Sequence, residues 1–363
     1  MVLSNKTPLV AVDIGSHSVK LAQLKEAKTG FELDSFGLLP LGPDAITEGV
    51  VKDPAAVVDA ISSLIKAEKI KTRFAVGSVS GEAVTINKIK LPLMSREDLQ
   101  RIIYKEAEKY IPFEANDVSL DFQILSCPDG GGSNFQTNGK VENELDKMEV
   151  LIVAVKKEVI DTRTEILLRA GLKPVLIDLN VFALMNAVGL SAEMDRKGAI
   201  ILVDLGDSLT HIHLVDGGFS YFTRVFKGVG RKCTKKLQST FKIPYRDATA
   251  IKTGVLPKSA DKQRVLDIMV ESFNPISNEI ASIAEMFEAQ NGRKPEKVFL
   301  CGGGAIISGI EELFQSNLKI PVEVFDPMRL VLFDREKFDF RCLSEIAPIA
   351  TVVIGLATRR FDY

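Results

Sequence analysis

Two short segments, far apart in the chain, each place a glycine two residues after an aspartate at the end of an apolar run. We call residues 13–18, with Asp13 and Gly15, the first bend, and residues 204–208, with Asp204 and Gly206, the second bend. A glycine directly after a strand lets the turn approach a ligand closely, and the N–H groups and hydroxyls of such a turn can donate to phosphate oxygens. An aspartate would repel phosphate, so its expected role is to face a Mg²⁺ ion that bridges the phosphates, through metal-bound water.

A third segment, the glycine run Gly302, Gly303 and Gly304, is followed by Ala305 and by a pattern that predicts a helix over 306–314. Consecutive glycines permit a flat group such as a nucleoside to lie against the backbone at a helix start. Taken singly, each bend is explained as an ordinary hairpin turn and the glycine run as an ordinary strand-to-helix connection. Two similar bends at corresponding positions favour a phosphate site.

The elements around these segments predict an α/β fold, because strand and helix patterns alternate along the chain. Residues 9–14 and 19–25 form an apolar strand pair around the first bend, which is a hairpin and not the strand followed by a helix that a Rossmann or P-loop site requires. A similar strand, 199–205, ends in the second bend. Two hairpins of one design, half a chain apart, predict two similar lobes that face one another.

Residues 82–168 read as a separate block of strand, helix, strand, loop, strand and helix. The loop, 127–146, is rich in Gly, Ser, Asn and charge, and we expect it to be mobile. The expected division is therefore a first lobe of 1–81 and 169–190 completed by a C-terminal helix, 346–363, an inserted subdomain, 82–168, and a second lobe, 191–345.

Composition excludes several classes of protein. The 363 residues carry 46 Lys and Arg against 48 Asp and Glu, so no global basic field for nucleic acid exists. The four cysteines lie far apart, which indicates buried free thiols in a reducing cytoplasm and no zinc site or disulfide framework. No signal peptide is visible, and the uncharged stretch 346–358 is shorter than the roughly 17–25 residues that span a bilayer. We therefore expect a cytoplasmic protein.

Two further patterns have alternative explanations. His211 and His213 point to one face of a strand and could form half of a metal site, but no third ligand is near in sequence, which favours an ordinary hairpin face. Residues 231–246 carry six basic side chains and no acid before Asp247. A polyphosphate or nucleic-acid contact is conceivable there, but a solvated helix face is the favoured interpretation.

The order of first bend, second bend and glycine run is similar to the phosphate-1, phosphate-2 and adenosine order of the actin-like ATPases, which the sequence resembles along its whole length. More closely, it resembles the PilM family of type IV pilus assembly in four segments, 11–21 (AVDIGSHSVKL), 147–158 (KMEVLIVAVKKE), 325–327 (FDP) and 354–357 (IGLA). The resemblance implies two lobes of duplicated ribonuclease-H-like sheets, with 82–168 as the subdomain that the family shares with the cell-division protein FtsA.

The resemblance implies that the chain binds ATP and Mg²⁺ through residues that match the family motifs. They are Asp13, Gly15, Ser16, His17, Ser18 and Lys20 in the first phosphate motif, Asp204, Gly206, Asp207, Ser208 and Thr210 in the second, Gly302, Gly303, Gly304 and Ala305 in the adenosine motif, and Lys252 beside the nucleoside. Asp13 and Asp204 would hold the metal through water. His17 stands where a small residue is more usual, and 227–230 departs from the paired glycines of the family.

One departure bears on affinity. Asp207 adds a carboxylate to the second bend, and this charge would weaken nucleotide binding unless it points to the metal or to solvent. No residue emerges as a catalytic base that orients water, so slow or negligible hydrolysis is expected.

The resemblance also implies partners. The family binds the N-terminal cytoplasmic peptide of the inner-membrane protein PilN, with the block 82–168 as one wall of the peptide groove, and links the membrane platform to cytosolic machinery. Contact with the membrane would then be indirect, through the partner, and motor ATPases and a homo-oligomer remain open. Two alternatives are a small-molecule kinase of the same superfamily, which needs an Asp base in the cleft, and an FtsA-like division protein, which usually carries a C-terminal amphipathic membrane helix.

Overall fold

The computed structural model describes residues 8–126, 147–191, 198–255 and 261–360, and the predicted mobile loop 127–146 lies outside them. The chain forms two compact units. Unit 1 comprises the residues up to Gly81 and from Arg163 onward, and unit 2 comprises Glu82–Thr162.

The first sheet of unit 1, the β1 sheet, has six strands in the order β10-β6-β1-β2-β3-β16. They are β1 (Val10–Ile14), β2 (Ser18–Glu26), β3 (Phe31–Pro40), β6 (Phe74–Val79), β10 (Lys173–Leu179) and β16 (Leu332–Phe333), with the short ladder β4 (Ile46–Thr47) and β5 (Val50–Val51) beside them. Strand β1 is antiparallel to β2 and parallel to β6. All of β1 is buried because helices cover both faces of the sheet: α1 (Pro54–Ala67) packs with Val10 and Val12, and the opposite face packs on α4 (Asn180–Val188) and α9 (Phe340–Ala357).

The second sheet, the β11 sheet, repeats this design in the order β13-β12-β11-β14-β15. Its strands are β11 (Ala199–Leu205), β12 (Leu209–Asp216), β13 (Phe219–Lys227), β14 (Lys297–Cys301) and β15 (Val322–Val324). Strand β11 is antiparallel to β12 and parallel to β14, as β1 is to β2 and β6. The outer face packs on four helices, α5 (Val229–Phe241), α6 (Tyr245–Lys252), α7 (Lys262–Asn291) and α8 (Ile310–Asn317). The repeated hairpins confirm the predicted α/β class with two similar lobes.

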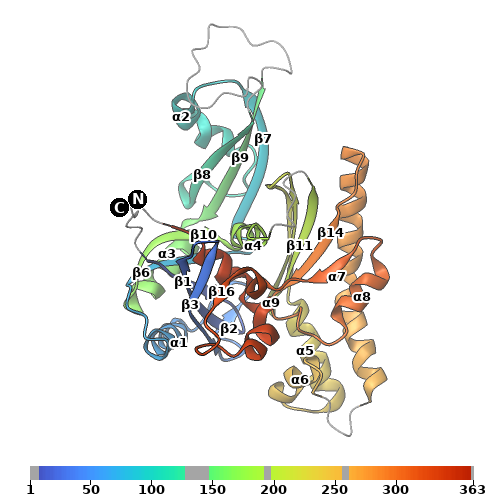
Figure 1. The fold of residues 1–363 in the computed structure, drawn as a ribbon. Coiled ribbons are helices and arrows are strands. Elements are labelled where there is room, and N and C mark those ends of the chain that lie inside the picture. Colours follow the sequence, from blue (N-terminus) through green and yellow to red (C-terminus); the bar gives the residue numbers. More distant parts are fainter. Residues whose placement is uncertain (1–7, 127–146, 192–197, 256–260, 361–363) are drawn as a thin grey trace. The chain divides into compact units, whose positions relative to one another are not determined.

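Two helices, α4 (Asn180–Val188) and α9 (Phe340–Ala357), lie between the two sheets (Figure 1) and share one core with both of them. Among the described helices, α9 has the length and apolar composition to cross a membrane. It is longer than the uncharged stretch 346–358 because it begins six residues earlier, at Phe340. Asp339 caps this start by accepting from the N–H groups of Arg341 and Cys342. Most of the apolar part is buried between the sheets, so packing within unit 1 accounts for its composition.

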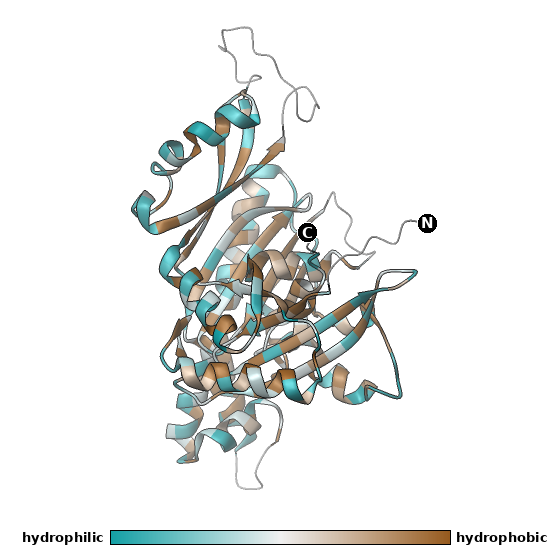
Figure 2. Ribbon diagram, turned by 90° about the vertical axis from the view of Figure 1, so that its left-hand side faces the viewer, coloured by the Kyte–Doolittle hydropathy of each residue, from teal (hydrophilic) through white to brown (hydrophobic). Residues whose placement is uncertain are grey.

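The hydropathy of the elements follows this packing. In Figure 2 the helices alternate between teal and brown, whereas the central strands are largely brown. Cys233 and Cys301 are buried free thiols, as expected. Cys342 is exposed, contrary to expectation, because it lies in the first turn of α9, ahead of the buried part of that helix; Cys127 lies outside the described residues.

Unit 2 is a three-stranded antiparallel sheet with the order β7-β9-β8, formed by β7 (Val84–Pro92), β8 (Val118–Ser126) and β9 (Lys147–Lys156). Helix α2 (Arg96–Ala107) buries Leu99 and Ile103 in the core of this unit, and the Ser95 side chain caps its start by accepting from the Asp98 N–H. Helix α3 (Lys157–Arg169) follows β9 without a loop, and the boundary between the units falls within it, at Thr162 and Arg163.

Candidate functional site

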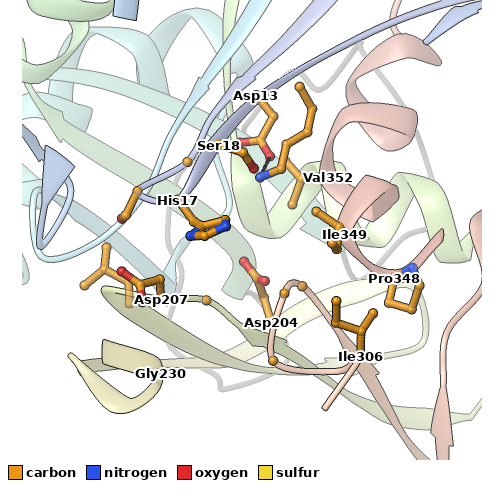
Figure 3. Close-up of a pocket in the computed structure, with 18 of the residues that line it drawn as sticks. Asp13, His17, Ser18, Asp204, Asp207, Gly230, Ile306, Pro348, Ile349 and Val352 are labelled. Atoms are coloured by element: carbon orange, nitrogen blue, oxygen red, sulfur yellow. Dashed lines mark hydrogen bonds and ion pairs between the residues drawn. The ribbon is translucent and has the colours of Figure 1, made fainter. Parts of the chain in front are cut away.

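A cavity in unit 1 is lined by both bends and by the glycine run (Figure 3). Thirteen of the residues singled out by the sequence line it: Asp13, Gly15, Ser16, His17, Ser18, Lys20, Asp204, Gly206, Asp207, Lys252, Gly302, Gly303 and Gly304. Strand ends from both sheets therefore meet at one place, as the repeated design requires. In Figure 3, Asp13 and Asp204 extend into this cavity from opposite sides.

Three of the predicted residues do not line the cavity. Ser208 and Thr210 are fully buried, and their hydroxyl oxygens have no hydrogen-bond partner among the described residues. Side chains alternate along a strand, and Leu209 and His211 of β12 face the cavity, so Thr210 between them faces away from it. Ser208 lies in the bend before β12 and is not among the lining residues. Ala305 is buried in the core of the β11 sheet.

The first bend is held by an internal ion pair. Asp13 and Lys20 are paired across the β1–β2 ladder, and the Lys20 Nζ donates to Asp13 Oδ2 at 3.0 Å, with both side chains buried. The Gly15 N–H donates to the Ser18 carbonyl at 3.1 Å and closes the turn. His17 is exposed at the tip, and its Nδ1 lies 3.3 Å from the Tyr245 hydroxyl of α6, so the first bend touches an element of the other lobe.

The second bend packs directly against the glycine run. Gly302 has φ +81°, a conformation that favours glycine, and a Cβ at this position would lie 2.2 Å from Asp204 Oδ1. The Gly304 N–H donates to the Leu205 carbonyl at 2.6 Å. Asp204 Oδ2 lies 3.6 Å from His211 Nδ1, its partner across the ladder. The glycine run thus allows the β14 end to approach the Asp204 carboxylate closely.

Asp207 does not carry a free charge into the cavity. Arg231 Nε and Nη2 each lie 3.0 Å from Asp207 Oδ2, and both side chains are largely buried. Arg231 Nη1 also lies 3.3 Å from Thr47 Oγ1, so this arginine joins α5 to the short ladder of the other lobe. The expectation that the basic run 231–246 is a solvated face is therefore wrong for Arg231. It is also the counterion that the sequence analysis did not assign to Asp207.

Arg231 reaches this position because α5 begins against the second bend. The Arg231 N–H donates to the Asp207 carbonyl at 2.9 Å. At Gly230, which lines the cavity, a Cβ would lie 2.7 Å from the Gly206 carbonyl oxygen, so this close approach depends on glycine. No local pattern in the sequence indicates this contact, since 24 residues separate the paired side chains.

Replacing Arg231 with methionine should lower the free energy of unfolding by about 2 kcal/mol, because Asp207 would keep its charge in a largely buried place without a partner. The value is below that for a fully buried pair because Asp207 lines the cavity, which water can enter. Urea unfolding of Arg231→Met and of the double variant Arg231→Met with Asp207→Asn measures the effect. The double variant should recover most of the loss; equal losses in both would contradict this explanation.

Lys252 lines the cavity, but its ammonium is already bound. Nζ donates to the Gly230 carbonyl and to Thr234 Oγ1, both at 3.1 Å, and so stabilises the first turn of α5. Burial lowers the pKa of Lys252. Its contribution to the cavity is therefore a positive charge held at the base of α5.

Several cavity residues were not assigned to the nucleotide site by the sequence analysis. The polar ones are Ser80, Arg163, Asn180, His211, Tyr245, Thr249 and Thr253, and α9 and the segment after the glycine run add an apolar wall of Ile306, Ile307, Ile346, Pro348, Ile349 and Val352. Figure 3 shows Ile306, Pro348, Ile349 and Val352 on one side of the cavity, and His17 and Asp207 on the other. The helix predicted from residue 306 begins at Ile310, because residues 303–309 form turns that end at Gly309 with φ +79°. The cavity therefore has an apolar end beside a polar one.

The two strand histidines have different surroundings, since His211 lines the cavity and His213 is fully buried. Among the described residues no group of three or more His, Cys, Asp or Glu side chains could hold a metal ion. His213 Nδ1 lies 2.7 Å from Thr223 Oγ1, and burial, followed by the effect of His211, lowers the pKa of His213 from 6.5 to about 3. His213 is thus a neutral core side chain.

This buried imidazole should make the protein sensitive to acid. In the unfolded chain His213 becomes protonated below pH 6.5, whereas in the folded chain it stays neutral down to about pH 3. The stability that the neutral imidazole allows above pH 6.5 is therefore lost as the pH falls. By pH 5 this contribution should amount to about 2 kcal/mol. Urea unfolding of the wild type and of His213→Gln at pH 7 and pH 5 tests it, and the variant should lose less stability than the wild type. Parallel losses would contradict it.

The family model of the type IV pilus assembly protein PilM matches residues 11–361. The chain belongs to the PilM family. A solved structure described as a PilM-PilN type IV pilus biogenesis complex is similar, with 26% identity and a TM-score of 0.83 over 98% of this chain and 98% of that one. This PilM-family chain is an actin-like protein of type IV pilus assembly.

Other similar proteins are more distant. The cell division protein FtsA of Borreliella burgdorferi is 22% identical over 388 residues, which cover 94% of this chain and 90% of FtsA. MreB5 of Spiroplasma citri, solved bound to AMPPNP, has a TM-score of 0.51 at 12% identity and covers 96% of this chain and 94% of its own. These likenesses support the actin-like fold, and the comparisons favour neither the kinase nor the division-protein alternative.

Proposed function

We propose that this PilM-family protein binds ATP with Mg²⁺ in the cavity of unit 1 and acts as an adaptor for the N-terminal cytoplasmic peptide of a PilN-like inner-membrane protein. The observation that carries the nucleotide part is that both bends and the glycine run line one cavity. In the sequence they are separate motifs far apart in the chain, and a shared nucleotide accounts for their meeting at one cavity.

The polar end of the cavity fits a metal-bound polyphosphate. Among the described residues no lysine or arginine pairs with Asp204, whose nearest titratable partner is His211 at 3.6 Å. A divalent cation would supply the missing positive charge, and carboxylates that face water are suitable groups to hold hydrated Mg²⁺. Asp13, with one oxygen held by Lys20, presents a fixed carboxylate on the opposite side. Ser16, Ser18 and the turn N–H groups are the donors proposed for phosphate oxygens.

The other end fits a nucleoside. A Cβ at Gly303 would meet nothing within 4 Å, so the backbone there is open to the cavity. Ile306, Pro348 and Ile349 offer apolar surface next to it. An apolar wall beside an open glycine backbone suits a flat base, and a few polar groups would fix its orientation.

The adaptor part of the proposal is supported by the likeness to the solved PilM-PilN complex over nearly the whole chain. The protein would be cytoplasmic and would reach the inner membrane through its partner. We propose that the inserted subdomain, assigned from sequence as 82–168, supplies one wall of the peptide groove. The nucleotide would lie between the first lobe, formed by 1–81, 169–190 and the C-terminal helix, and the second lobe, 191–345.

The test is calorimetric titration with a synthetic peptide from the cytoplasmic N-terminus of the PilN-like protein encoded with this chain. We expect one peptide per chain, with an affinity that differs between the Mg-ATP-bound and nucleotide-free protein. A scrambled peptide of the same composition is the control. Absence of peptide binding both with and without Mg-ATP would refute the adaptor proposal and leave the nucleotide proposal standing.

A further inference from the structure

Arg163 is a buried cation without adequate partners. It is 5% exposed, and its Nε and Nη1 atoms have no hydrogen-bond partner among the described residues. Its Nη2 reaches the Gly49 carbonyl only at 3.5 Å, the outer limit of a hydrogen bond. Burial lowers the pKa of Arg163 to about 10, while the charge of Asp13 opposes this effect. Unsatisfied buried charges are costly and rare, so this one requires an explanation.

The explanation lies in the position of the side chain. Arg163 lines the same cavity as both bends. The acid that influences it, Asp13, is already paired with Lys20. The cavity that Arg163 lines is therefore the place where a ligand could supply the missing partners, and a guanidinium in such a place is suited to a multidentate anion such as phosphate.

Arg163 also occupies a particular place in the chain. It belongs to α3, which begins at Lys157 directly after the last strand of unit 2. Residues up to Thr162 cluster with unit 2, and Arg163 is the residue at which the chain re-enters unit 1. A ligand that holds Arg163 therefore also holds the helix that connects the two units.

We propose that Arg163 binds a phosphate of the nucleotide and thereby links occupation of the cavity to the ordering of helix α3, through which the inserted unit is attached. This inference rests on the proposed nucleotide function and goes beyond it, because it assigns a residue outside the three motifs and a route from the cavity to unit 2. Phosphate would give Arg163 the partners that the described residues do not supply.

The test compares Arg163→Met with Arg169→Met, a control on the same helix that removes an exposed arginine paired with Glu165. Without nucleotide, Arg163→Met should melt at the wild-type temperature or higher, because it removes an unpaired buried charge. Its affinity for Mg-ATP should be about 10- to 100-fold weaker in calorimetry, the range for one charged hydrogen-bonding group. Adenosine, measured by its displacement of Mg-ATP, should bind Arg163→Met and the wild type with equal affinity. Arg169→Met should match the wild type in melting temperature and in both affinities.

Hydrogen exchange tests the link to unit 2. Saturating Mg-ATP should slow exchange of residues 157–162 in the wild type and in Arg169→Met, and should leave it unchanged in Arg163→Met. If the wild type binds Mg-ATP and Arg163→Met binds it with the same affinity, this inference alone is overturned. A clearly lowered melting temperature of Arg163→Met would also overturn it, because that result would indicate a structural role for Arg163. Slowed exchange in saturated Arg163→Met overturns the link to α3. A wild-type protein that binds no nucleotide overturns the proposed nucleotide function, and this inference with it.

Discussion

Replacing Gly302 with alanine should lower the free energy of unfolding by about 2–5 kcal/mol and remove nucleotide binding. An L-residue in the left-handed region costs roughly 1–2 kcal/mol, and forcing an atom into an occupied place costs roughly 1–3 kcal/mol more. Both penalties apply here, since φ is +81° and the added Cβ would lie 2.2 Å from Asp204 Oδ1. The Asp204 carboxylate would have to move, and with it the proposed metal site. Urea unfolding and Mg-ATP titration measure the two effects.

Gly303→Ala is the matched control. Gly303 has no positive φ, and no atom lies within 4 Å of the methyl group that alanine would add there. The free energy of unfolding of Gly303→Ala should therefore stay within about 0.5 kcal/mol of the wild type. Equal destabilisation by both substitutions would show that the close approach of the glycine run to Asp204 is not what requires Gly302.

Replacing Asp204 with asparagine should weaken Mg-ATP binding about 10- to 100-fold. This is the usual effect of removing a group that holds a metal indirectly, through a water molecule bound to the metal. The folded protein should tolerate this change, because no lysine or arginine among the described residues depends on Asp204. Calorimetry in Mg²⁺, repeated with a chelator, should show that the variant has lost the metal dependence of the wild type.

Asp13→Asn is the informative comparison, because the same chemical change should have a second effect there. It leaves the Lys20 ammonium buried without its partner at 3.0 Å, so the free energy of unfolding should fall by about 3 kcal/mol in addition to the loss of affinity. If Asp204→Asn proved as unstable as Asp13→Asn, the assignment of Asp204 to a ligand and not to the fold would be wrong.

The parts of the site that could be predicted from sequence are those with a local signal. A strand, an aspartate and a glycine within a few residues define each bend, and the glycine run follows β14 directly; these positions line the cavity. Ser208 and Thr210 do not line the cavity. Alternation along β12 separates Thr210 from Leu209 and His211, but it does not tell from sequence which face of the strand meets the cavity.

The residues that could not be predicted depend on contacts across the fold. Arg231 became part of the site only because α5 starts against the second bend, and Arg163 only because the fold places this residue of α3 at the cavity. Neither has a motif around it. The actin-like duplication was predictable because each hairpin is specified by a short local pattern in the sequence. The counterions of the buried carboxylates come instead from helices that only tertiary packing brings near.

The most direct test of the central claim is calorimetric titration of the wild-type protein with ATP in the presence of Mg²⁺ and after its removal by a chelator. If the two bends and the glycine run together hold one magnesium-bound nucleotide, one ATP binds per chain, and the affinity falls at least tenfold when Mg²⁺ is removed. Failure to bind ATP at millimolar concentration, or binding that neither the chelator nor Asp204→Asn weakens, would contradict it.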